Sequence, residues 1–391
     1  MKADVLHLID NFEQGGTERQ ALQLVRLLAE SGRFGVRLAC FERRGSLLEE
    51  ALRLGLGEIE EYPLRSFYDA NAARQFRRFA RRLRREGVRI VHAHGFYTNV
   101  FGVIGASLAG TPARVASRRE GRVFRTPARE RFERRAVFPL AHAVVANADA
   151  VRAELIEGGV PARKVFTVYN GLDLARVATR LARDEALEAL GLPRDRRLVT
   201  LVANVNHPVK DQPTFLRAAR RVREAVPDAA FVLAGEGRLL GESRALAASL
   251  GLADDVFFTG RCERVGDLLS VSDVCALSSK VEGFSNAILE YMAAARPVVT
   301  TDVGGAREAV EEGETGYVVA PGDDEAMAAR VVELLRDPER ARRMGERGRR
   351  VVEEKFSCEA QLARTEALYE SLLEKRSPAQ AASALPRRES V

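Results

Sequence analysis

Short apolar runs alternate with helical patterns along almost the whole chain. The runs are nearly continuous and rich in β-branched residues, which is typical of strands buried on both faces of a parallel sheet. They occupy residues 3–9, 35–41, 88–94, 113–117, 143–148, 165–170, 198–205, 229–235, 255–260, 274–279, 297–302 and 316–320. Between them, apolar residues recur at helical spacing, which indicates strand–helix–strand units with right-handed crossovers. We therefore predict an α/β protein built from doubly wound parallel sheets.

One segment interrupts this alternation and divides the chain into two halves of similar size. Residues 172–196 are charged and rich in Ala and Leu, and 391 residues exceed what one hydrophobic core usually organises. We predict an N-terminal Rossmann-like domain over residues 1–172 and a second one over residues 173–355. A further helical pattern covers residues 356–375, and the polar tail at 376–391 is expected to be disordered.

Composition narrows the class of protein. Apolar residues make up 46% of the chain and charged residues 30%, as in soluble globular proteins. The sequence contains no run of ~18 apolar residues, the length needed to span a membrane. The N-terminal segment carries Asp4 and Asp10 where a signal peptide would be apolar, so it is interpreted as a strand. Four cysteines without a C-x-x-C pair favour a reducing cytoplasm over a disulfide framework or a zinc ribbon. The formal net charge of +6 suits an anionic partner without identifying it.

Four loops at predicted strand ends carry candidate chemistry, because open α/β sheets bind ligands beyond the carboxyl ends of their strands. In the first loop, Gly15 and Gly16 open a helix whose N–H groups could hold an anion, although an ordinary tight turn explains them equally well. In the second, V-H-A-H, we expect His92 to face inward and His94 to face the ligand side, although a lone histidine is more often structural. In the third, Lys210 stands near a helix start and could pair with a phosphate, as could many exposed lysines.

The fourth loop reads V-E-G-F-S-N-A-I-L-E-Y. Glu282 follows a strand, and Gly283 lets the backbone turn. Ser285 or Asn286 then caps a helix whose first N–H groups favour a phosphate. Glu290 lies about a turn inside that helix, so the two carboxylates are expected to reach opposite ends of one elongated ligand and to accept hydrogen bonds from its hydroxyls. The plain alternative, a capped helix with two solvated acids, does not explain the small residues between the glutamates.

The E-x7-E spacing of this loop closely resembles the signature of the family 4 retaining glycosyltransferases. Glutamate is common in helices, so the motif alone is weak, but further segments follow the family in order over nearly the whole chain. They are Gly15-Gly16, H-A-H at 92–94, V-V-A-N-A-D-A-V at 144–151, V-Y-N-G-L-D at 168–173, L-A-G-E-G at 233–237 and T-G-Y-V-V-A-P-G-D at 315–323. The resemblance implies the GT-B fold, in which two Rossmann-like domains face a central cleft and a C-terminal helix, here 356–375, crosses back to the first domain.

The resemblance also implies a role for each candidate residue. Glu282 would contact the hydroxyls of the donor sugar, and Glu290 would contact the ribose of the nucleotide. Lys210 and the backbone amides at the helix start would hold the diphosphate, and His94 would lie near the reaction centre. His94, Lys210 and Glu282 would thus form the catalytic set. The donor-binding set would comprise Gly15, Gly16, Asn204, Lys210, Arg261, Glu282, Gly283, Phe284, Ser285, Asn286, Ala287 and Glu290.

One position departs from the family pattern. The family commonly has an arginine shortly before the phosphate-binding lysine, where this chain has Asn204. Lys210, the helix dipole and Arg261 would then have to stabilise the leaving group, and the role of Asn204 is left open.

The reaction implied by the resemblance is retaining transfer of a hexose from a nucleotide-diphosphate sugar, with UDP or GDP as the carrier. The acceptor would be a glycan or a lipid-linked molecule in polysaccharide, lipopolysaccharide or glycolipid biosynthesis. No D-x-D motif stands at a strand end, so we expect no divalent metal and no other cofactor.

Arginine is dense at 117–135 and 74–85, which suits an anionic lipid or the inner face of the plasma membrane, although solvated arginines explain it equally well. We therefore expect a cytoplasmic protein that can associate with that membrane. Two other classes stay open: a sugar-nucleotide epimerase with the same fold, and a basic binding protein without enzymatic activity. No nucleic-acid-binding motif is present, so no nucleic-acid partner is expected.

Overall fold

The computed structural model describes residue 2, residues 4–121 and residues 126–374. Its contacts divide the chain into two compact units. The first consists of the chain up to Gly171 together with the C-terminal helix α15 (Cys358–Leu373), and the second runs from Leu172 to Ser357. The predicted boundary at 172 lies next to this division, and the segment 172–196 belongs to the second unit.

The first unit is built on a sheet with the strand order β3-β2-β1-β4-β5-β6-β7, in which every neighbouring pair is parallel. The strands are β1 (Asp4–Ile9), β2 (Gly35–Cys40), β3 (Glu60–Glu61), β4 (Ile90–Ala93), β5 (Ala113–Arg118), β6 (Ala143–Ala146) and β7 (Val165–Thr167). The order of the strands reverses between β1 and β4, where His7 is the register partner of His92. Such a switch point leaves a crevice at the carboxyl edge of the sheet.

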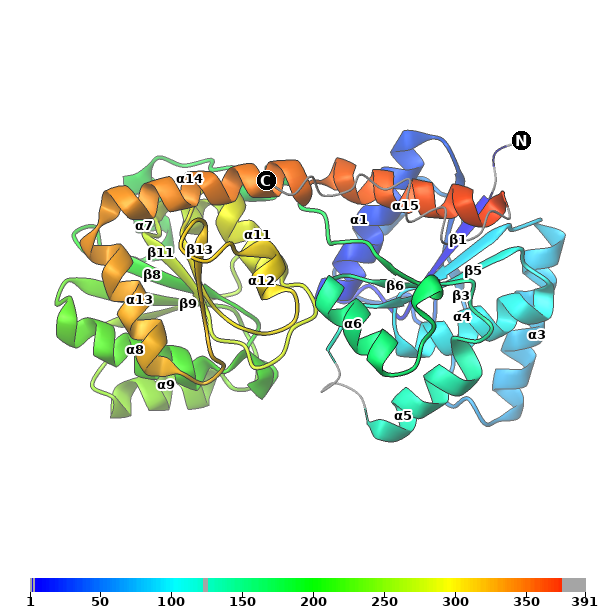
Figure 1. The fold of residues 1–391 in the computed structure, drawn as a ribbon, viewed down its shortest axis with the longest axis horizontal. Helices are drawn as coiled ribbons and strands as arrows, with labels where there is room; N and C mark the ends of the chain where they lie inside the picture. The colour runs from blue at the N-terminus through cyan, green and yellow to red at the C-terminus, as the bar shows by residue number, and fades with distance from the viewer. Residues whose placement is uncertain (1, 3, 122–125, 375–391) are drawn as a thin grey trace. The chain divides into compact units, whose positions relative to one another are not determined.

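Helices cover both faces of this sheet (Figure 1). They are α1 (Gly16–Ser31), α2 (Leu48–Arg53), α3 (Ala70–Arg85), α4 (Phe96–Ala109), α5 (Pro127–Phe132), a π-helical turn (Glu133–Val137), α6 (Asp149–Glu157) and α15. Although α15 is far from the sheet in sequence, its Leu368 and Tyr369 are buried in one core cluster with Val5 and Ile90. Gln361 of α15 also exchanges hydrogen bonds with glutamines of α1, so α15 is an integral part of the first unit.

The second unit has a parallel sheet of the same kind, with the order β10-β9-β8-β11-β12-β13. Its strands are β8 (Arg197–Val202), β9 (Ala229–Ala234), β10 (Val256–Gly260), β11 (Val274–Leu277), β12 (Val298–Thr301) and β13 (Gly316–Val319). Its helices are α7 (Arg183–Leu190), α8 (Gln212–Ala225), α9 (Leu240–Ser249), α10 (Val265–Val271), α11 (Asn286–Ala293), α12 (Ala306–Ala309), α13 (Asp324–Arg336) and α14 (Pro338–Lys355). The order reverses between β8 and β11, so this sheet has its own switch point.

All twelve predicted apolar runs coincide with strands, which confirms the doubly wound α/β prediction. The edge strand β3 was missed because its two residues, Glu60 and Glu61, carry no apolar pattern. The tail 376–391, for which disorder was expected, lies outside the described residues. None of the helices in the described part of the chain is both long enough and apolar enough to cross a membrane.

Candidate active site

The switch point of the second unit brings together the loops that follow β8 and β11. Lys210 comes from the first loop and Glu282 from the second, and Lys210 Nζ lies 2.6 Å from Glu282 Oε1. Ser279 Oγ donates a second hydrogen bond to the same carboxylate oxygen, at 2.7 Å. The two charged side chains are only 23% and 13% exposed, so a cation and an anion are held together at a poorly solvated sheet edge. Two predicted site residues therefore meet in space.

The loop of Lys210 is fixed by residues that the sequence analysis did not single out. Lys210 ends a 3-10 turn (Pro208–Lys210), and Asp211 follows in the left-handed conformation with φ 46°. Asp tolerates that conformation better than most residues. Ser278, directly after β11, places its hydroxyl 3.0 Å from the carbonyl oxygen of Lys210 and 2.9 Å from that of Asp211. Lys280 Nζ lies 3.1 Å from Asp211 Oδ1, so the S-S-K segment after the strand anchors the lysine loop.

The helix α11 begins directly after this loop and presents its N-terminus there. Its N-cap residue, Ser285, makes no side-chain capping hydrogen bond with the described residues, so no side chain at the N-cap position satisfies the backbone N–H groups of the first turn. Phe284 is buried and packs on Phe356 with ring centroids 5.1 Å apart, which fixes the entry to the helix. Gly304 has φ 53°, and a Cβ there would lie 2.3 Å from the carbonyl oxygen of Gly283, so only glycine allows this close approach of two loops.

Glu290 points from α11 into a second ion pair. Its Oε1 lies 3.0 Å from Nη2 of Arg176, and its side chain is 10% exposed. Arg176 belongs to a 3-10 turn (Leu174–Val177) at the start of the second unit, and the sequence analysis missed it because an arginine in an arginine-rich chain gives no signal. The carboxylate of Glu290 is thus oriented by a cation and does not lie free on the surface.

Two further predicted residues lie at the same edge of the sheet without joining the Lys210–Glu282 pair. Asn204 follows β8, where its carbonyl oxygen accepts a hydrogen bond from Gln212 Nε2 at 3.2 Å. Arg261 follows β10, two strands away from β8, and its Nη1 lies 3.9 Å from Glu236 Oε1.

The switch point of the first unit holds the remaining predicted residues. Gly15 is the N-cap of α1 and Gly16 is its first residue, and Gly15 has an ordinary φ of −103°. A Cβ at Gly15 would meet only the carboxylate of Glu18, a flexible side chain, so the fold itself does not require glycine at that position. Asp10 follows β1, and burial, together with the charges of nearby glutamates, raises the pKa of its carboxyl to about 7.

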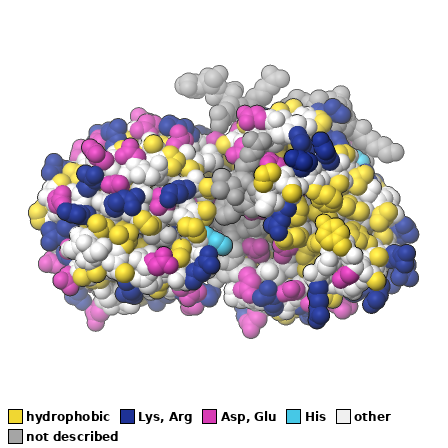
Figure 2. Space-filling view, turned by 90° about the horizontal axis from the view of Figure 1, so that it is seen from below, with side chains coloured by type: hydrophobic (Ala, Val, Ile, Leu, Met, Phe, Trp, Pro, Cys, Tyr) yellow, Lys and Arg dark blue, Asp and Glu magenta, His cyan; other side chains and the backbone are white. Residues whose placement is uncertain are grey.

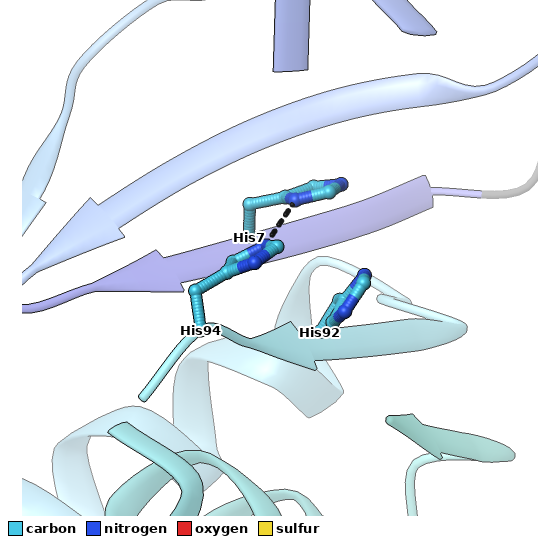
Figure 3. Close-up of side chains that lie close together, drawn as sticks. All are labelled: His7, His92 and His94. Atoms are coloured by element: carbon cyan, nitrogen blue, oxygen red, sulfur yellow. Dashed lines mark hydrogen bonds between the residues drawn. The ribbon is translucent and has the colours of Figure 1, made fainter. Parts of the chain in front are cut away.

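The expectation that His92 and His94 face opposite ways is wrong. Residues two apart in a strand share a face, and the two rings stack with centroids 4.2 Å apart. His7 of β1 joins them, with its Nδ1 2.9 Å from His94 Nε2 (Figure 3). All three imidazoles are buried, and burial lowers their pKa values, that of His7 to about 3 with Arg119 contributing, so the rings are neutral at pH 7.

Several buried polar atoms at this edge have no hydrogen-bond partner in the described structure. Each belongs to a residue that directly follows a strand: β1, β4, β5 and β6. They are Asp10 Oδ1, His94 Nδ1, Arg119 Nε and Asn147 Oδ1. Because unpaired buried polar atoms are costly, their concentration at one sheet edge indicates a place where a polar ligand can supply the missing partners.

Comparisons with known proteins cover both units. The model "Glycosyltransferase Family 4" matches residues 14–176, and the model "Glycosyl transferases group 1" matches residues 182–351. N-acetyl-alpha-D-glucosaminyl L-malate synthase of Bacillus anthracis is 32% identical over 54% of this chain and 55% of its own. Putative glycosyltransferase EpsF of Bacillus subtilis is 29% identical over 76% of this chain and 79% of its own. With the first of these relatives, the match spans only about half of the relative's length.

Solved structures agree with the fold. Anabaena Alr3699/HepE, crystallised in complex with UDP-glucose, is 19% identical, with a TM-score of 0.83 over 94% of this chain and 99% of its own. Sucrose-phosphate synthase of Thermosynechococcus elongatus is 21% identical, with a TM-score of 0.78 over 96% of this chain and 100% of its own. The two parallel-sheet units are those of the GT-B fold. Since the two family models together cover residues 14–351 with only 177–181 between them, the chain belongs to the group 1 glycosyltransferases of glycosyltransferase family 4.

Proposed function

We propose that this protein transfers a sugar, with retention of configuration, from a nucleotide-diphosphate sugar to a glycan or lipid-linked acceptor. The observation that carries the proposal is the arrangement at the switch point of the second unit. There, one lysine, two oriented carboxylates and the N-terminus of α11 converge from loops far apart in sequence. Family membership and the UDP-glucose complex of Anabaena Alr3699/HepE support the same chemistry.

In this proposal, donor binding separates the ion pair between Lys210 and Glu282, and each side chain then contacts the donor. The β-phosphate takes the ammonium of Lys210 and the N–H groups of α11, while Glu282 is released to accept a hydrogen bond from a hydroxyl of the donor sugar. Glu290, held by Arg176, accepts a hydrogen bond from the ribose. Positive charge is therefore placed where negative charge develops as the nucleotide departs. Electrostatic stabilisation of this kind is usually the largest single contribution to lowering an enzyme's activation barrier.

The bonds that change are few. The bond between the anomeric carbon and the phosphate oxygen breaks, and its electron pair leaves with the nucleoside diphosphate. The acceptor oxygen forms a new bond to the anomeric carbon on the face from which the phosphate leaves, and its proton passes to a phosphate oxygen. The transition state has oxocarbenium character, so stabilising the leaving phosphate is the protein's main task. Lysine and helix N–H groups supply that stabilisation without a divalent metal in this proposal.

The acceptor is proposed to lie against the first unit, whose sheet edge holds the unpartnered Asp10, Arg119 and Asn147 atoms. Figure 2 shows hydrophobic side chains gathered on one face of this unit, with Lys and Arg beside them. Exposed Tyr68 and Phe132 supply apolar surface of the kind that suits a lipid-linked acceptor or a membrane interface. Among the relatives, one is a phosphatidylinositol monomannoside mannosyltransferase and others act in lipopolysaccharide core biosynthesis.

Several arginines of the arginine-rich segments are bound within the protein, which weakens the case that these segments bind a membrane. In α3, the Arg78 and Arg82 side chains pair with Glu60, and Arg84 donates to the carbonyl oxygen of Leu108. Residues 122–125 of the other arginine-rich segment lie outside the described residues. We therefore base the proposed function on the polar residues at the carboxyl edges of the two sheets and not on the number of arginines.

The test is product formation from a ¹³C-labelled nucleotide sugar and a bacterial lipid extract. We expect release of nucleoside diphosphate that depends on the extract, and a product whose anomeric coupling by NMR matches that of the donor. An inverted product would contradict retention. Conversion of the nucleotide sugar to its epimer without an acceptor would favour the epimerase alternative.

A further inference from the structure

Five buried side chains of the first unit form one continuous hydrogen-bonded row that ends at His94. Ser117 Oγ lies 2.6 Å from His92 Nε2, and His92 Nδ1 lies 2.6 Å from the hydroxyl of Tyr369. That hydroxyl lies 3.4 Å from His7 Nε2, and His7 Nδ1 lies 2.9 Å from His94 Nε2. The row crosses from β5 through β4, α15 and β1 to the residue after β4, so distant segments of the chain meet in it.

Counting protons along the row leaves two fully bonded arrangements. A neutral imidazole has one N–H donor and one lone pair, and a hydroxyl has one proton to donate. If Ser117 donates at one end, every bond points toward His94, whose Nε2 accepts and whose Nδ1 therefore carries the proton. If Ser117 accepts, every bond points the other way, and His94 Nδ1 carries a lone pair instead.

The Ser117 end decides between the two arrangements. When Ser117 accepts from His92, its own hydroxyl proton needs another acceptor. The only hydrogen bond of Ser117 Oγ to the described residues is the one to His92, and Ser117 is fully buried. That arrangement leaves two buried groups without a partner, the Ser117 hydroxyl proton and the His94 Nδ1 lone pair, whereas donation by Ser117 leaves one, the His94 Nδ1 proton, for which a bound ligand can supply the acceptor. Ser117 should therefore donate.

We propose that Ser117, His92, Tyr369 and His7 are positioning residues that hold His94 as the Nδ1–H tautomer, so that it presents a hydrogen-bond donor to an oxygen atom of the bound substrate. His94 Nδ1 is the buried ring nitrogen that the row leaves without a partner in the described structure (Figure 3). The substrate contact rests on the proposed function, whereas the tautomer does not. In this role His94 is a donor and not a general base, because the nitrogen that faces the ligand already carries a proton.

A metal ion held by the three histidines explains the same cluster less well. The nitrogens His7 Nδ1 and His94 Nε2 are 2.9 Å apart, a hydrogen-bond distance, whereas two nitrogens at ~2.0–2.1 Å from a tetrahedral zinc lie further apart. Both ring nitrogens of His92 already have hydroxyl partners. The buried guanidinium of Arg119, which lowers the pKa of all three rings, would also repel a cation.

The tautomer can be read directly by ¹H–¹⁵N long-range correlation NMR of protein labelled in the histidine rings. The chain has five histidines, and the spectrum of a His94→Asn variant assigns the His94 signals. We expect His94 Nδ1 to be protonated in the wild type, and a mixture of tautomers in Tyr369→Phe, which removes the central hydroxyl. Tyr62→Phe is the matched control, because it removes another buried hydroxyl of the same unit, one without a hydrogen-bond partner in the described structure.

Ser117→Ala gives a second, independent variant that should also release the tautomer, should Tyr369→Phe fail to fold. Protonation of His94 at Nε2 in the wild type would overturn the proposal, as would an unchanged His94 tautomer in both variants. Zinc retained at about one ion per chain and lost on His7→Leu substitution would also overturn it, in favour of the metal site.

Activity then tests the substrate contact separately. His7→Asn keeps an amide donor near the place of His7 Nδ1, whereas His7→Leu removes it. We expect kcat to fall about tenfold in His7→Leu, the effect of about one hydrogen bond, and to recover in His7→Asn with the donor KM little changed. Equal activity of the two variants would reject the contact even if the tautomer is as expected. A wild type without any sugar transfer, but with the expected tautomer, would refute the proposed function and leave the row intact.

Discussion

Replacement of Lys210 by Met tests the proposed phosphate site most severely, because it removes the charge and keeps most of the side-chain length. In the structure, Lys210 Nζ lies 2.6 Å from Glu282 Oε1, and the lysine side chain is 23% exposed. The variant removes the cation that would face the departing phosphate. It also leaves the Glu282 carboxylate, 13% exposed, without that partner, so that an uncompensated negative charge remains at the phosphate site.

The size of the effect follows from the partial burial of the pair. Two unit charges ~4 Å apart interact by about 4 kcal/mol at an effective dielectric constant of 20. Removing one preorganised donor from a site of developing negative charge typically costs about 2.7–4 kcal/mol, or 10²- to 10³-fold in kcat. The N–H groups of α11 remain in the variant, so we expect a loss between about tenfold and about 10³-fold, mainly in kcat.

The assay is nucleoside diphosphate release at saturating donor and acceptor, beside thermal unfolding of each variant. Lys355→Met is the matched control, because Lys355 also pairs with a glutamate of the second unit, Glu311, at 3.0 Å, but both side chains are more exposed, at 51% and 35%. The control should retain near wild-type turnover. Turnover of Lys210→Met within about twofold of the wild type, or an equal loss in the control, would refute the assigned role.

Three further predictions concern binding, metal and pH. Glu290→Ala should raise the donor KM by about tenfold through loss of a charge-assisted hydrogen bond, and an unaltered KM would remove the ribose contact. EDTA should leave turnover unchanged, so activity restored only by a divalent ion would overturn the metal-free proposal. Because burial raises the pKa of Asp10 to about 7 in the folded state from 3.8, the folded chain holds a proton there that the unfolded chain has lost. The free energy of unfolding should therefore fall as pH rises from about 4 to about 7, by at most roughly 1.4 kcal/mol per pH unit, and level off above pH 7. Denaturant unfolding of Asp10→Asn should show a shallower fall over the same range. Parallel curves of unfolding free energy against pH for the variant and the wild type would contradict this assignment.

The sheet cores were predictable from the sequence because strands buried on both faces leave long apolar runs. The loops at the strand ends were also identified, since the carboxyl edge rule needs only the order of strands and helices. The ion pair between Lys210 and Glu282 shows that the loops after β8 and β11 meet. The order of strands and helices along the chain could not give the distance between these side chains.

Side-chain partnerships were much less predictable. Arg176 orients Glu290 from a turn in the segment where only a connection was expected, and arginine carries no signal in a chain so rich in it. The error over His92 and His94 came from misapplying strand periodicity, since residues i and i+2 share a face. The link from His92 to Tyr369 joins positions 277 residues apart, and no local pattern could reveal it.

A thermal-shift measurement with UDP-, GDP- and ADP-sugars shows whether the folded protein binds a nucleotide-sugar donor. At a concentration of about 100 times the dissociation constant, a ligand of the folded state adds about 2.7 kcal/mol of stability. For a unit of this size that is a rise of roughly 5–10 °C in Tm, which Lys210→Met should largely abolish and Lys355→Met should keep. We expect such a rise with one of the three nucleotide sugars; no rise with any of them, or an equal rise in Lys210→Met, would refute donor binding at Lys210.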